Sequence, residues 1–579
     1  MPLTANADIH PDYPDVITVD CTFHVKDVVK RVPGARWSNA RRTWSVPLSW
    51  GSCLALRTEF GSELVVGPAL KEWAASKRVH QDAMTALRTS LEPSDEFEAG
   101  DEPGWADLFP YQCVGSELIR LANGRYFVLD ETGCGKSRTA LAGVAKLDGP
   151  FPMMIVAPKS MLRTWEKEAH MFFGPGTLDV RVIAGTPKQR TTALEPGGHI
   201  YVVSYSTLRQ HSRLSGYGKA KLTEAQREPK ELNAIDFRTV LVDEAHRAKN
   251  PTAAQTRALW AAAGDAPYRI AMTGTPIQEN AEDLWALLHF VEPDVFTSKS
   301  AYADRYLNME WNRWGGRDVT GLKPGTRDEF FAVFDAMSRR VTKDAALPFL
   351  PPKLFEVRWV ELPPKLRKAY NSMQKDLIAE LETTTLAASS VLERAGRLLQ
   401  LANSSGEVDA DGVYHMTLPS PKVESFLDDL AAGDFGDQSV VVFSDSRQLV
   451  DLLSSELDRL GYDHLAITGD VTGDDRQAAM DKFQAGEVKL LLLTRAGGEG
   501  ITLTKASTMV RLVRSWSHTV HRQSEDRVHR IGSEQHSSVT YVDYVVADTV
   551  EEGQLIRLNS KEAAAQEVLR DRDLLNILS

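Results

Sequence analysis

The sequence predicts an α/β protein with two tandem lobes, each a parallel sheet flanked by helices, plus helical insertions and a small N-terminal α+β module. Apolar runs alternate with helix-compatible segments, as in the strand-helix crossovers of a buried parallel sheet. A second series of such runs follows a charged helical stretch. The chain has 579 residues, which is enough for three or four domains of about 150 residues each.

Composition excludes several classes of protein. The chain is 42% hydrophobic and 25% charged, which argues against a collagen-like, coiled-coil or wholly disordered protein. Its formal net charge of -12 means that any nucleic-acid surface must be local. The four cysteines include no C-x-x-C pair, so neither a zinc ribbon nor a disulfide scaffold is supported.

Compartment and membrane contact are also constrained. Cysteine usage makes a reducing compartment the default expectation. The N-terminal residues lack a basic segment followed by an apolar one, and no apolar run approaches the roughly 18 residues that a membrane span needs. We therefore expect a soluble, monomeric, cytoplasmic protein, located in the host cytoplasm if a phage encodes it.

Residues 1–70 are predicted to form a small module that contains strands, because short alternating stretches are interrupted by Pro and Gly. The module is locally basic, and three tryptophans lie among its cations. Two interpretations stay open: a solvated basic face over an aromatic core, or a nucleic-acid surface that uses charge for phosphates and rings for stacking. The second interpretation makes Arg36, Arg41 and Arg42 candidate DNA contacts.

The remaining chain divides by composition and periodicity. Residues 71–107 are predicted to form a helix and an acidic, Pro- and Gly-containing linker. The first lobe is expected at 108–298, with strands at 125–130, 152–158, 199–205, 239–244 and 268–274. A helical insertion and connector at 299–362 and a helical insertion at 363–418 precede the second lobe at 419–550. Its strands are expected at 438–445, 464–469, 488–494, 508–513 and 539–546, followed by a C-terminal helical tail at 551–579.

The first expected strand of lobe 1 leads into a glycine-rich loop and then a helix-compatible run. The loop residues are Thr132, Gly133, Cys134, Gly135, Lys136 and Ser137. In this context main-chain N–H groups and a helix N-terminus converge on phosphate oxygens, and Lys136 adds a positive charge. Ser137 would ligate Mg²⁺. The strict pattern wants glycine at Asp130, so a chance glycine turn is the alternative.

An acidic pair ends a later apolar strand, in the segment TVLVDEAHRAKN. Asp243 can hold the water shell of a bound magnesium ion, and Glu244 can orient and deprotonate the attacking water. The alternative is a helix N-cap with acidic residues in its first turn. That alternative loses weight because the glycine-rich loop and the acidic pair occur in order within one lobe.

Several segments together resemble the Swi/Snf-type DNA translocases of helicase superfamily 2. They follow the family's order between about residues 108 and 547: LFPYQ, DETGCGKS, APKSMLRTWEKE, VVSYSTLR, MTGTPIQENAEDLWALLHF, VVVFSDS, TRAGGEGITLTKA and HRQSEDRVHRIGSEQ. The resemblance implies two RecA-like lobes with ATP and Mg²⁺ at their cleft. It also makes Gln112 the adenine-recognising glutamine, and it explains Asp130, because the family has aspartate there.

The resemblance assigns further residues to the site. Arg527 and Arg530 match the arginines that stabilise charge on the transferred phosphoryl group, and Gln523 matches the glutamine of the same motif. Gly498 and Gly500 match a loop beside the nucleotide. Candidate DNA contacts are Lys159, Ser160, Thr275, Thr494, Arg495 and Trp516. We also expect a locally basic surface from Lys505, Arg511, Arg514, Arg522, Arg527 and Arg530.

The sequence departs from the family at a few positions. Cys134 replaces a leucine and would place a thiol beside the phosphates, so we expect thiol reagents to inhibit the ATPase. Val513, Ser517 and His518 replace an acidic residue and an Asn-Pro pair. The N-terminal spacing of Trp37, Trp44, Pro47 and Leu48 is similar to the HARP module of annealing helicases, which implies binding to DNA forks or junctions.

The function expected from these features is ATP-dependent translocation on double-stranded DNA. Its outcome would be strand annealing, fork remodelling or displacement of bound protein. Two alternatives stay open: a strand-separating helicase on DNA or RNA, and a nucleic-acid binding protein with a vestigial ATPase.

Overall fold

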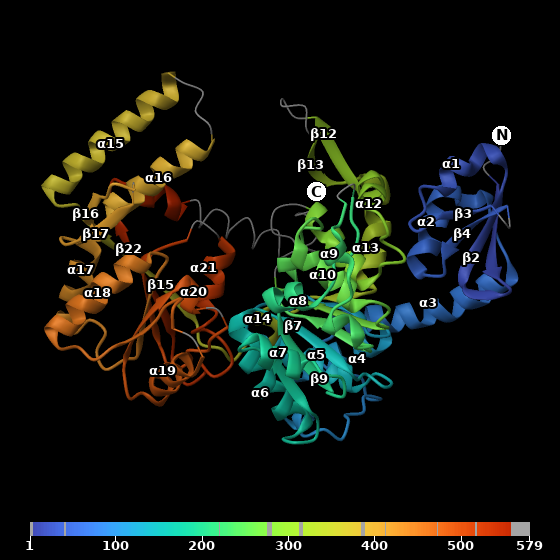
Figure 1. The fold of residues 1–579 in the computed structure, drawn as a ribbon, viewed down its shortest axis with the longest axis horizontal. Helices are drawn as coiled ribbons and strands as arrows, with labels where there is room; N and C mark the ends of the chain where they lie inside the picture. The colour runs from blue at the N-terminus through green and yellow to red at the C-terminus, as the bar shows by residue number, and fades with distance from the viewer. Residues whose placement is uncertain are drawn as a thin grey trace. The chain divides into compact units, whose positions relative to one another are not determined.

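The computed structural model describes residues 4–39, 42–218, 221–274, 281–311, 317–383, 388–411, 413–471, 473–498, 500–515 and 518–556 (Figure 1). The chain divides into two compact units, the first ending at Ala346 and the second beginning at Leu347. Each unit holds a parallel sheet flanked by helices, which confirms the predicted fold class. Among the described helices, none combines the length and apolar character needed to cross a bilayer.

The N-terminal module is a mixed five-stranded sheet with the strand order β3-β4-β2-β1-β5. Its elements are β1 (Ala5–His10), β2 (Tyr13–Cys21), α1 (Lys26–Val29), β3 (Arg36–Ser38), β4 (Thr43–Pro47), α2 (Trp50–Phe60) and β5 (Leu64–Val66). The module has its own apolar core, which includes the inward residues Ile17, Val19, Trp44, Val46 and Leu56. The 22-residue helix α3 (Pro68–Thr89) leads from this module to the rest of the unit (Figure 1).

The main sheet of the first unit has seven parallel strands in the order β14-β6-β11-β10-β7-β9-β8. The strands are β6 (Arg125–Val128), β7 (Met153–Ala157), β8 (Val180–Ile183), β9 (Ile200–Ser204), β10 (Thr239–Val242), β11 (Tyr268–Met272) and β14 (Ser338–Arg339). The five predicted strands are present. The prediction lacked β14, which has two residues, and the half-buried edge strand β8, because neither forms a continuous apolar run.

Helices cover both faces of this sheet. They are α4 (Pro110–Leu121), α5 (Lys136–Ala145), α6 (Leu162–Phe173), α7 (Pro187–Ala193), α8 (Tyr205–His211), α9 (Glu224–Arg227), α10 (Ala254–Ala263), α11 (Trp285–Val291), α12 (Lys299–Tyr306), α13 (Arg327–Asp335) and α14 (Lys343–Ala346). Buried residues of α4, α5 and α6 share one apolar core, and those of α8 and α10 to α13 share the other.

The segment after α12 differs from the all-helical prediction. An antiparallel hairpin of β12 (Leu307–Trp311) and β13 (Arg317–Leu322) lies between α12 and α13. Leu307 pairs with Leu322, and both are buried against the core of the unit. The short apolar stretches of this hairpin carry too little periodicity to separate strand from helix in the sequence.

The second unit contains a six-stranded parallel sheet in the order β15-β22-β21-β18-β20-β19. Its strands are β15 (Lys353–Val360), β18 (Val440–Ser444), β19 (Leu465–Ile467), β20 (Leu490–Thr494), β21 (Thr508–Val513) and β22 (Val539–Val546). Five of these six strands were predicted. The sixth, β15, was assigned to the connector, because it is an edge strand in which charged residues interrupt the apolar ones.

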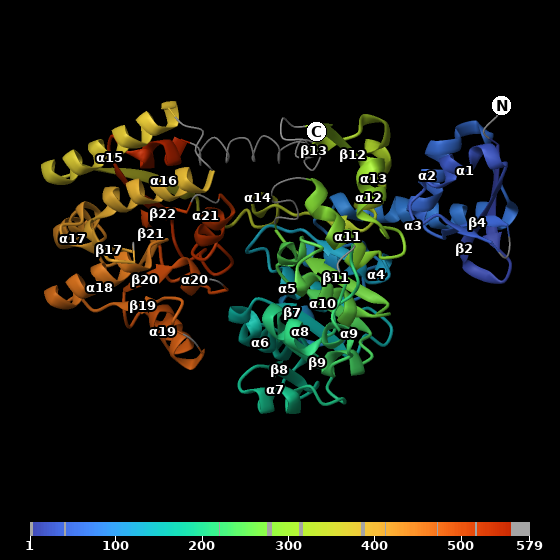
Figure 2. The same ribbon diagram turned by 45° about the horizontal axis from the view of Figure 1, so that its top comes forward.

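Helices and a small hairpin complete the second unit. They are α15 (Pro364–Thr383), α16 (Ala388–Asn403), β16 (Ser405–Val408), β17 (Tyr414–Thr417), α17 (Pro421–Ala432), α18 (Arg447–Leu460), α19 (Gly473–Ala485), α20 (Arg495–Gly498) and α21 (His518–Glu525). The helices α15 and α16 lie side by side, as Figure 2 shows, and occupy the segment predicted as a helical insertion.

A buried ion-pair cluster fixes α21 to the sheet of the second unit. The Arg511 side chain is 2% exposed and donates hydrogen bonds to Asp543 on β22 and Glu525 on α21 at 2.7 Å each. Lys353 on β15 donates to the same Glu525 at 3.0 Å. Burial acts to raise the pKa of Glu525, but Lys353 and Arg511 outweigh it and lower that pKa to about 2.

The expected basic surface of this unit is therefore partly wrong. Arg511 and Arg514 are both buried, and Arg511 is neutralised by acidic partners far along the chain. A count of cations in the sequence does not reveal such pairing.

Removal of one carboxylate from this cluster should destabilise the second unit. Asp543→Ala leaves the buried guanidinium of Arg511 undercompensated, at an expected cost of about 3–5 kcal/mol in the free energy of unfolding. Asp543→Asn, which keeps one acceptor oxygen, should cost less. Urea unfolding followed by hydrogen exchange in peptides of β21 and β22 measures the effect; a change below about 1 kcal/mol for Asp543→Ala would contradict it.

Candidate nucleotide-binding site

The glycine-rich loop connects β6 to α5 in the geometry that the sequence predicts. Gly133 and Gly135 have φ of 93° and 72°, values that glycine adopts without strain, and Gly135 is the N-cap of α5. The first N–H groups of α5 therefore point toward the loop and can receive an anion. Lys136 donates hydrogen bonds from Nζ to the carbonyl oxygens of Asp130 and Glu131 at 2.9 and 3.2 Å.

Two side chains of α4 brace this loop. Gln112 is 1% exposed and donates from Nε2 to the carbonyl oxygens of Cys134 and Gly135 at 3.1 and 3.3 Å. The Tyr111 hydroxyl donates to the same Cys134 carbonyl at 2.8 Å. A Cβ atom on Gly135 would lie 2.4 Å from Gln112 Nε2, so the close approach also requires glycine. Recognition of adenine by Gln112 stays a prediction.

Asp130, which stands where the general phosphate-loop pattern has glycine, and its neighbour Glu131 bind the main chain of a second segment. The Asp130 carboxylate accepts a hydrogen bond from the Val341 amide at 3.0 Å, and Glu131 accepts one from the Lys343 amide at 3.0 Å. Glu131 also pairs with Arg340 at 3.1 Å. Val341 and Lys343 follow β14 near the end of the first unit. The sequence predicted no role for Glu131, although its neighbour Asp130 departs from the glycine of the general pattern.

The acidic pair lies at the carboxyl end of β10. Asp243 accepts hydrogen bonds from Trp165 Nε1 at 3.0 Å and from the Glu244 amide at 2.9 Å. The Tyr205 hydroxyl donates to the carbonyl oxygens of Asp243 and Glu244 at 2.8 and 3.1 Å. Glu244 has a φ of 47°, a left-handed conformation that turns the chain sharply after the strand.

Strand order brings the acidic pair and the loop to one edge of the sheet. The strand β11 pairs with β10 on one side and with β6 on the other, all three parallel. Gly274, just after β11, lies against the loop: a Cβ atom there would be 3.2 Å from Thr132 Oγ1. The structure therefore brings Lys136, Asp243 and Glu244 to one edge of the sheet.

The electrostatic environment of Asp243 and Glu244 favours the binding of a cation. Burial, reinforced by the Glu244 charge, raises the pKa of Asp243 to about 6 despite the hydrogen bond from Trp165. His246 Nδ1 lies 3.3 Å from Glu244 Oε2 and 3.1 Å from Thr273 Oγ1, and burial lowers the pKa of His246. A neutral imidazole adds no positive charge beside the two carboxylates, so Lys136 is the cation that acts on Asp243.

A magnesium ion suits this donor set. Asp243 offers a carboxylate whose ionisation a cation would favour, and Ser137 lies in the first turn of α5. Within the described residues, no group of three or more His, Cys, Asp or Glu side chains could hold a metal by itself.

Burial of Cys134 bears on the expected reactivity of its thiol. Its side chain is fully buried, with 0% of its surface exposed, and burial raises the pKa of the thiol to about 12. Reagents attack the thiolate of an accessible cysteine. Burial therefore disfavours the expected inhibition by thiol reagents through Cys134, which stays a prediction.

The predicted residues of the second unit cluster at the loops after β20 and around α21. Thr494 is buried, and its hydroxyl accepts a hydrogen bond from the Gly497 amide at 3.3 Å. A Cβ atom on Gly497 would lie 1.8 Å from the Ile467 carbonyl oxygen, so this turn requires glycine. Gly498 ends α20, and Gly500 has a φ of 76°. Gln523 lies in α21, and Arg527 and Arg530 follow it.

The remaining candidate DNA contacts have mixed outcomes. Lys159 and Arg495 are exposed, and Ser160 is half-buried. In the N-terminal module Arg36 and Arg42 are exposed, whereas of its tryptophans Trp44 is buried and Trp37 packs edge-on against it, with 48% of Trp37 exposed. Both interpretations of the module thus stay open. Arg41, Thr275 and Trp516 lie outside the described residues.

A phosphate loop and an acidic pair at one sheet edge, in the first of two tandem parallel-sheet units, define a nucleotide-binding protein of the RecA-like class. The comparison with known families is more specific. The chain belongs to the SNF2-related domain family, which matches residues 63–407, and the helicase conserved C-terminal domain matches residues 423–532. This result confirms the family resemblance found in the sequence. The HARP-like character of the N-terminal module stays a prediction.

Curated relatives agree with this family. The chain is 29% identical over 483 residues to a probable chromatin-remodeling complex ATPase chain of Oryza sativa subsp. japonica, covering 78% of this chain and 40% of the relative. It is 27% identical over 511 residues to the ISWI chromatin-remodeling complex ATPase ISW1 of Saccharomyces cerevisiae, covering 82% and 42%. A putative ATP-dependent helicase/translocase of Bacillus subtilis, YwqA, is 26% identical over 486 residues, covering 82% and 50%.

The chain spans half or less of the length of these three relatives. Among solved structures, the SWI2/SNF2 ATPase core of Sulfolobus solfataricus in complex with double-stranded DNA is similar, with a TM-score of 0.37 and 22% identity. That similarity covers 84% of this chain and 96% of the solved chain.

The raised pKa of Asp243 should make stability depend on pH. The folded protein holds this proton more tightly than the unfolded chain does, so the contribution favours folding below pH of about 4 and is lost as pH rises through about 6. The free energy of unfolding of Asp243→Asn, relative to that of the wild type, should therefore rise by about 2 kcal/mol as the pH is raised from about 4.5 to about 7.5. Urea unfolding of metal-free protein measures it. An equal difference in the free energy of unfolding between variant and wild type at both pH values would contradict a raised pKa of Asp243.

Proposed function

We propose that this chain is an ATP-dependent translocase on double-stranded DNA of the Swi/Snf type. The observation that carries the proposal is the meeting of Lys136 with Asp243 and Glu244 at one sheet edge. The chain also carries both the SNF2-related domain and the helicase C-terminal domain. The names of its relatives, chromatin-remodeling ATPases and a helicase/translocase, support the same activity.

The first unit supplies the groups that bind and activate. The amides at the start of α5 and the ammonium of Lys136 bind the phosphates of ATP. Ser137 and Asp243 would hold Mg²⁺, which neutralises phosphate charge when bound. Glu244, adjacent to Asp243 but turned by its left-handed backbone, orients the attacking water and accepts its proton.

The second unit supplies the charge that hydrolysis needs. As the phosphoryl group leaves ATP, negative charge spreads over its oxygens, and a guanidinium stabilises it. We assign this role to Arg527 and Arg530, with Gln523 beside them in sequence. Hydrolysis then requires both units together, so that each turnover is tied to a change in the position of one unit relative to the other.

DNA would be contacted by strand-end loops of both units. We assign contacts with the sugar-phosphate backbone to Lys159, Ser160 and Thr275 in the first unit and to Thr494, Arg495 and Trp516 in the second. Hydroxyls, amides and a few cations suffice for such contacts, which is compatible with a net charge of -12. Arg36, Arg41 and Arg42 of the N-terminal module would add contacts that favour forks or junctions.

Loss of a phosphate-handling residue should abolish DNA-stimulated ATP turnover without abolishing DNA binding. We expect Lys136→Ala and Glu244→Gln to lower turnover by about 100-fold or more, because each removes a group that acts on the reacting phosphate or water. Lys188→Ala and Glu228→Gln, both at exposed positions, are the matched controls. Turnover with and without duplex DNA, together with DNA affinity, gives the result; full turnover in either variant contradicts the assigned roles.

The same preparation distinguishes translocation from strand separation. A translocase should displace a labelled third strand from a triplex while leaving a plain duplex intact. Release of a duplex strand without triplex displacement would favour the helicase alternative. Absence of ATP turnover under all conditions would favour the vestigial ATPase.

A further inference from the structure

The N-terminal module and the first lobe belong to one compact unit but have separate apolar cores. Direct packing between them includes α2 of the module against α13 of the lobe and Gly34 of the module against the main chain of Asp294. In α2, Leu54 packs on the core of the lobe, and a Cβ atom on Gly51 would lie 3.0 Å from Val333 Cγ2. Through the chain itself, the module is joined to the lobe by α3.

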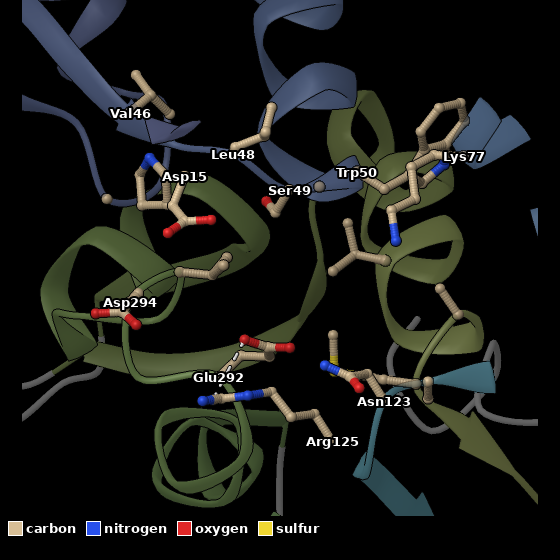
Figure 3. Close-up of a pocket in the computed structure, with 18 of the residues that line it drawn as sticks. Asp15, Val46, Leu48, Ser49, Trp50, Lys77, Asn123, Arg125, Glu292 and Asp294 are labelled. Carbon is tan, nitrogen blue, oxygen red and sulfur yellow. Dashed lines mark ion pairs between the residues drawn. The ribbon is translucent and has the colours of Figure 1, made fainter. Parts of the chain in front are cut away.

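An open cavity of about 760 Å³ interrupts this seam. Figure 3 shows Leu48 and Trp50 of the module on one side of the cavity, and Arg125 and Glu292 of the lobe on the other. Arg125 and Glu292 pair with each other at 3.7 Å and do not bridge the cavity. Apolar packing across the seam is therefore incomplete, and other contacts must fix the position of the module.

One guanidinium makes polar contacts on both sides of the seam. Arg305 on α12 has a side chain that is 3% exposed. It donates hydrogen bonds to both carboxylate oxygens of Glu329 on α13, at 2.7 and 2.5 Å. On the module side it donates to Glu59 of α2 at 2.8 Å and to the carbonyl oxygen of Arg31 at 3.1 Å. A single buried side chain thus binds a carboxylate from each side of the seam.

The arrangement makes Arg305 hard to replace. Burial acts to lower the pKa of Arg305, but Glu329 and Glu59 outweigh it and raise that pKa, so the guanidinium stays charged. Without it, the poorly exposed carboxylates of Glu329 and Glu59 would keep only the Tyr306 hydroxyl and the exposed Arg31 as partners. The Arg31–Glu59 pair, at 3.5 Å with Arg31 66% exposed, is too solvated to substitute.

We propose that Arg305 is a positioning residue that fixes the N-terminal module on the first lobe, so that the two bind one DNA molecule as a single rigid body. The DNA part rests on the proposed function. Two binding surfaces held at a fixed separation bind more tightly than the same surfaces on a loose connection, because the second contact costs less entropy. The exposed cations of the module, Arg36 and Arg42, would then act together with the loops of the lobe.

The first test is Arg305→Met in the full chain, which removes the charge and keeps the length of the side chain. Basal ATP turnover should stay within twofold of the wild type, whereas the duplex concentration that gives half-maximal stimulation should rise about tenfold. Arg163→Met, at an exposed position of α6 with its own Glu166 partner, is the matched control. If Arg305→Met unfolds the module, the triple variant with Glu59→Gln and Glu329→Gln removes the unpaired charges and gives the same comparison.

The second test is rescue by a cross-link. Gly51→Cys and Val333→Cys place two cysteines across the seam, where a Cβ atom on Gly51 would lie 3.0 Å from Val333 Cγ2. In the Arg305→Met background, oxidation should return half-maximal stimulation to within twofold of the wild type, and reduction should reverse it. Peptide mass identifies the bridge, which must not involve Cys53. A purely local folding defect would not respond to this reversible link.

The outcomes separate the two proposals. Hydrogen exchange in α2 and α13 needs no DNA, and it should be faster in Arg305→Met than in the wild type. Equal exchange, an unchanged half-maximal concentration, or failure of the disulfide to rescue overturns the anchoring role of Arg305. A wild-type protein whose ATP turnover does not respond to DNA, while Arg305→Met still speeds exchange, overturns the proposed function and leaves the anchor in place.

Discussion

The nucleotide site depends on the adjacency of three parallel strands, β6, β11 and β10. Since parallel strands end at the same edge of a sheet, the loop after β6 and the acidic pair after β10 must meet there. Gly274, after the strand between them, leaves room for this meeting by lying against Thr132. The roles assigned to Lys136, Asp243 and Glu244 follow from this order, because it brings the loop and the acidic pair to the same edge.

The phosphate loop is held from two sides. Gln112 and Tyr111 bind its carbonyl groups from α4, while the carboxylates of Asp130 and Glu131 bind the amides of the segment that leaves the first unit. A glycine at position 130, as in the general phosphate-loop pattern, could not make that second contact. Asp130 therefore has a structural role, because its carboxylate binds the start of the loop to the segment that continues into the second unit.

Local signals in the sequence predicted most of the nucleotide site. Buried strands form continuous apolar runs, and the loop and the acidic pair are short motifs. The strands and the motifs can therefore be recognised in the sequence without knowledge of the fold. What escaped prediction depends on partners distant in sequence. The neutralisation of Arg511 by Asp543, the burial of the Cys134 thiol and the binding of Glu59 by Arg305 all require the folded chain. The edge strand β15 escaped because charged residues break its apolar pattern.

The central claim is that a reaction centre begun by Lys136, Asp243 and Glu244 is finished by arginines of the other unit. The most direct measurement is single-turnover hydrolysis by Arg527→Ala and Arg530→Ala, compared with their affinity for ATP. The account predicts that at least one variant keeps ATP affinity within about threefold while the rate of hydrolysis falls by about 10³-fold. Hydrolysis at the wild-type rate in both variants, and in the double variant, would contradict it.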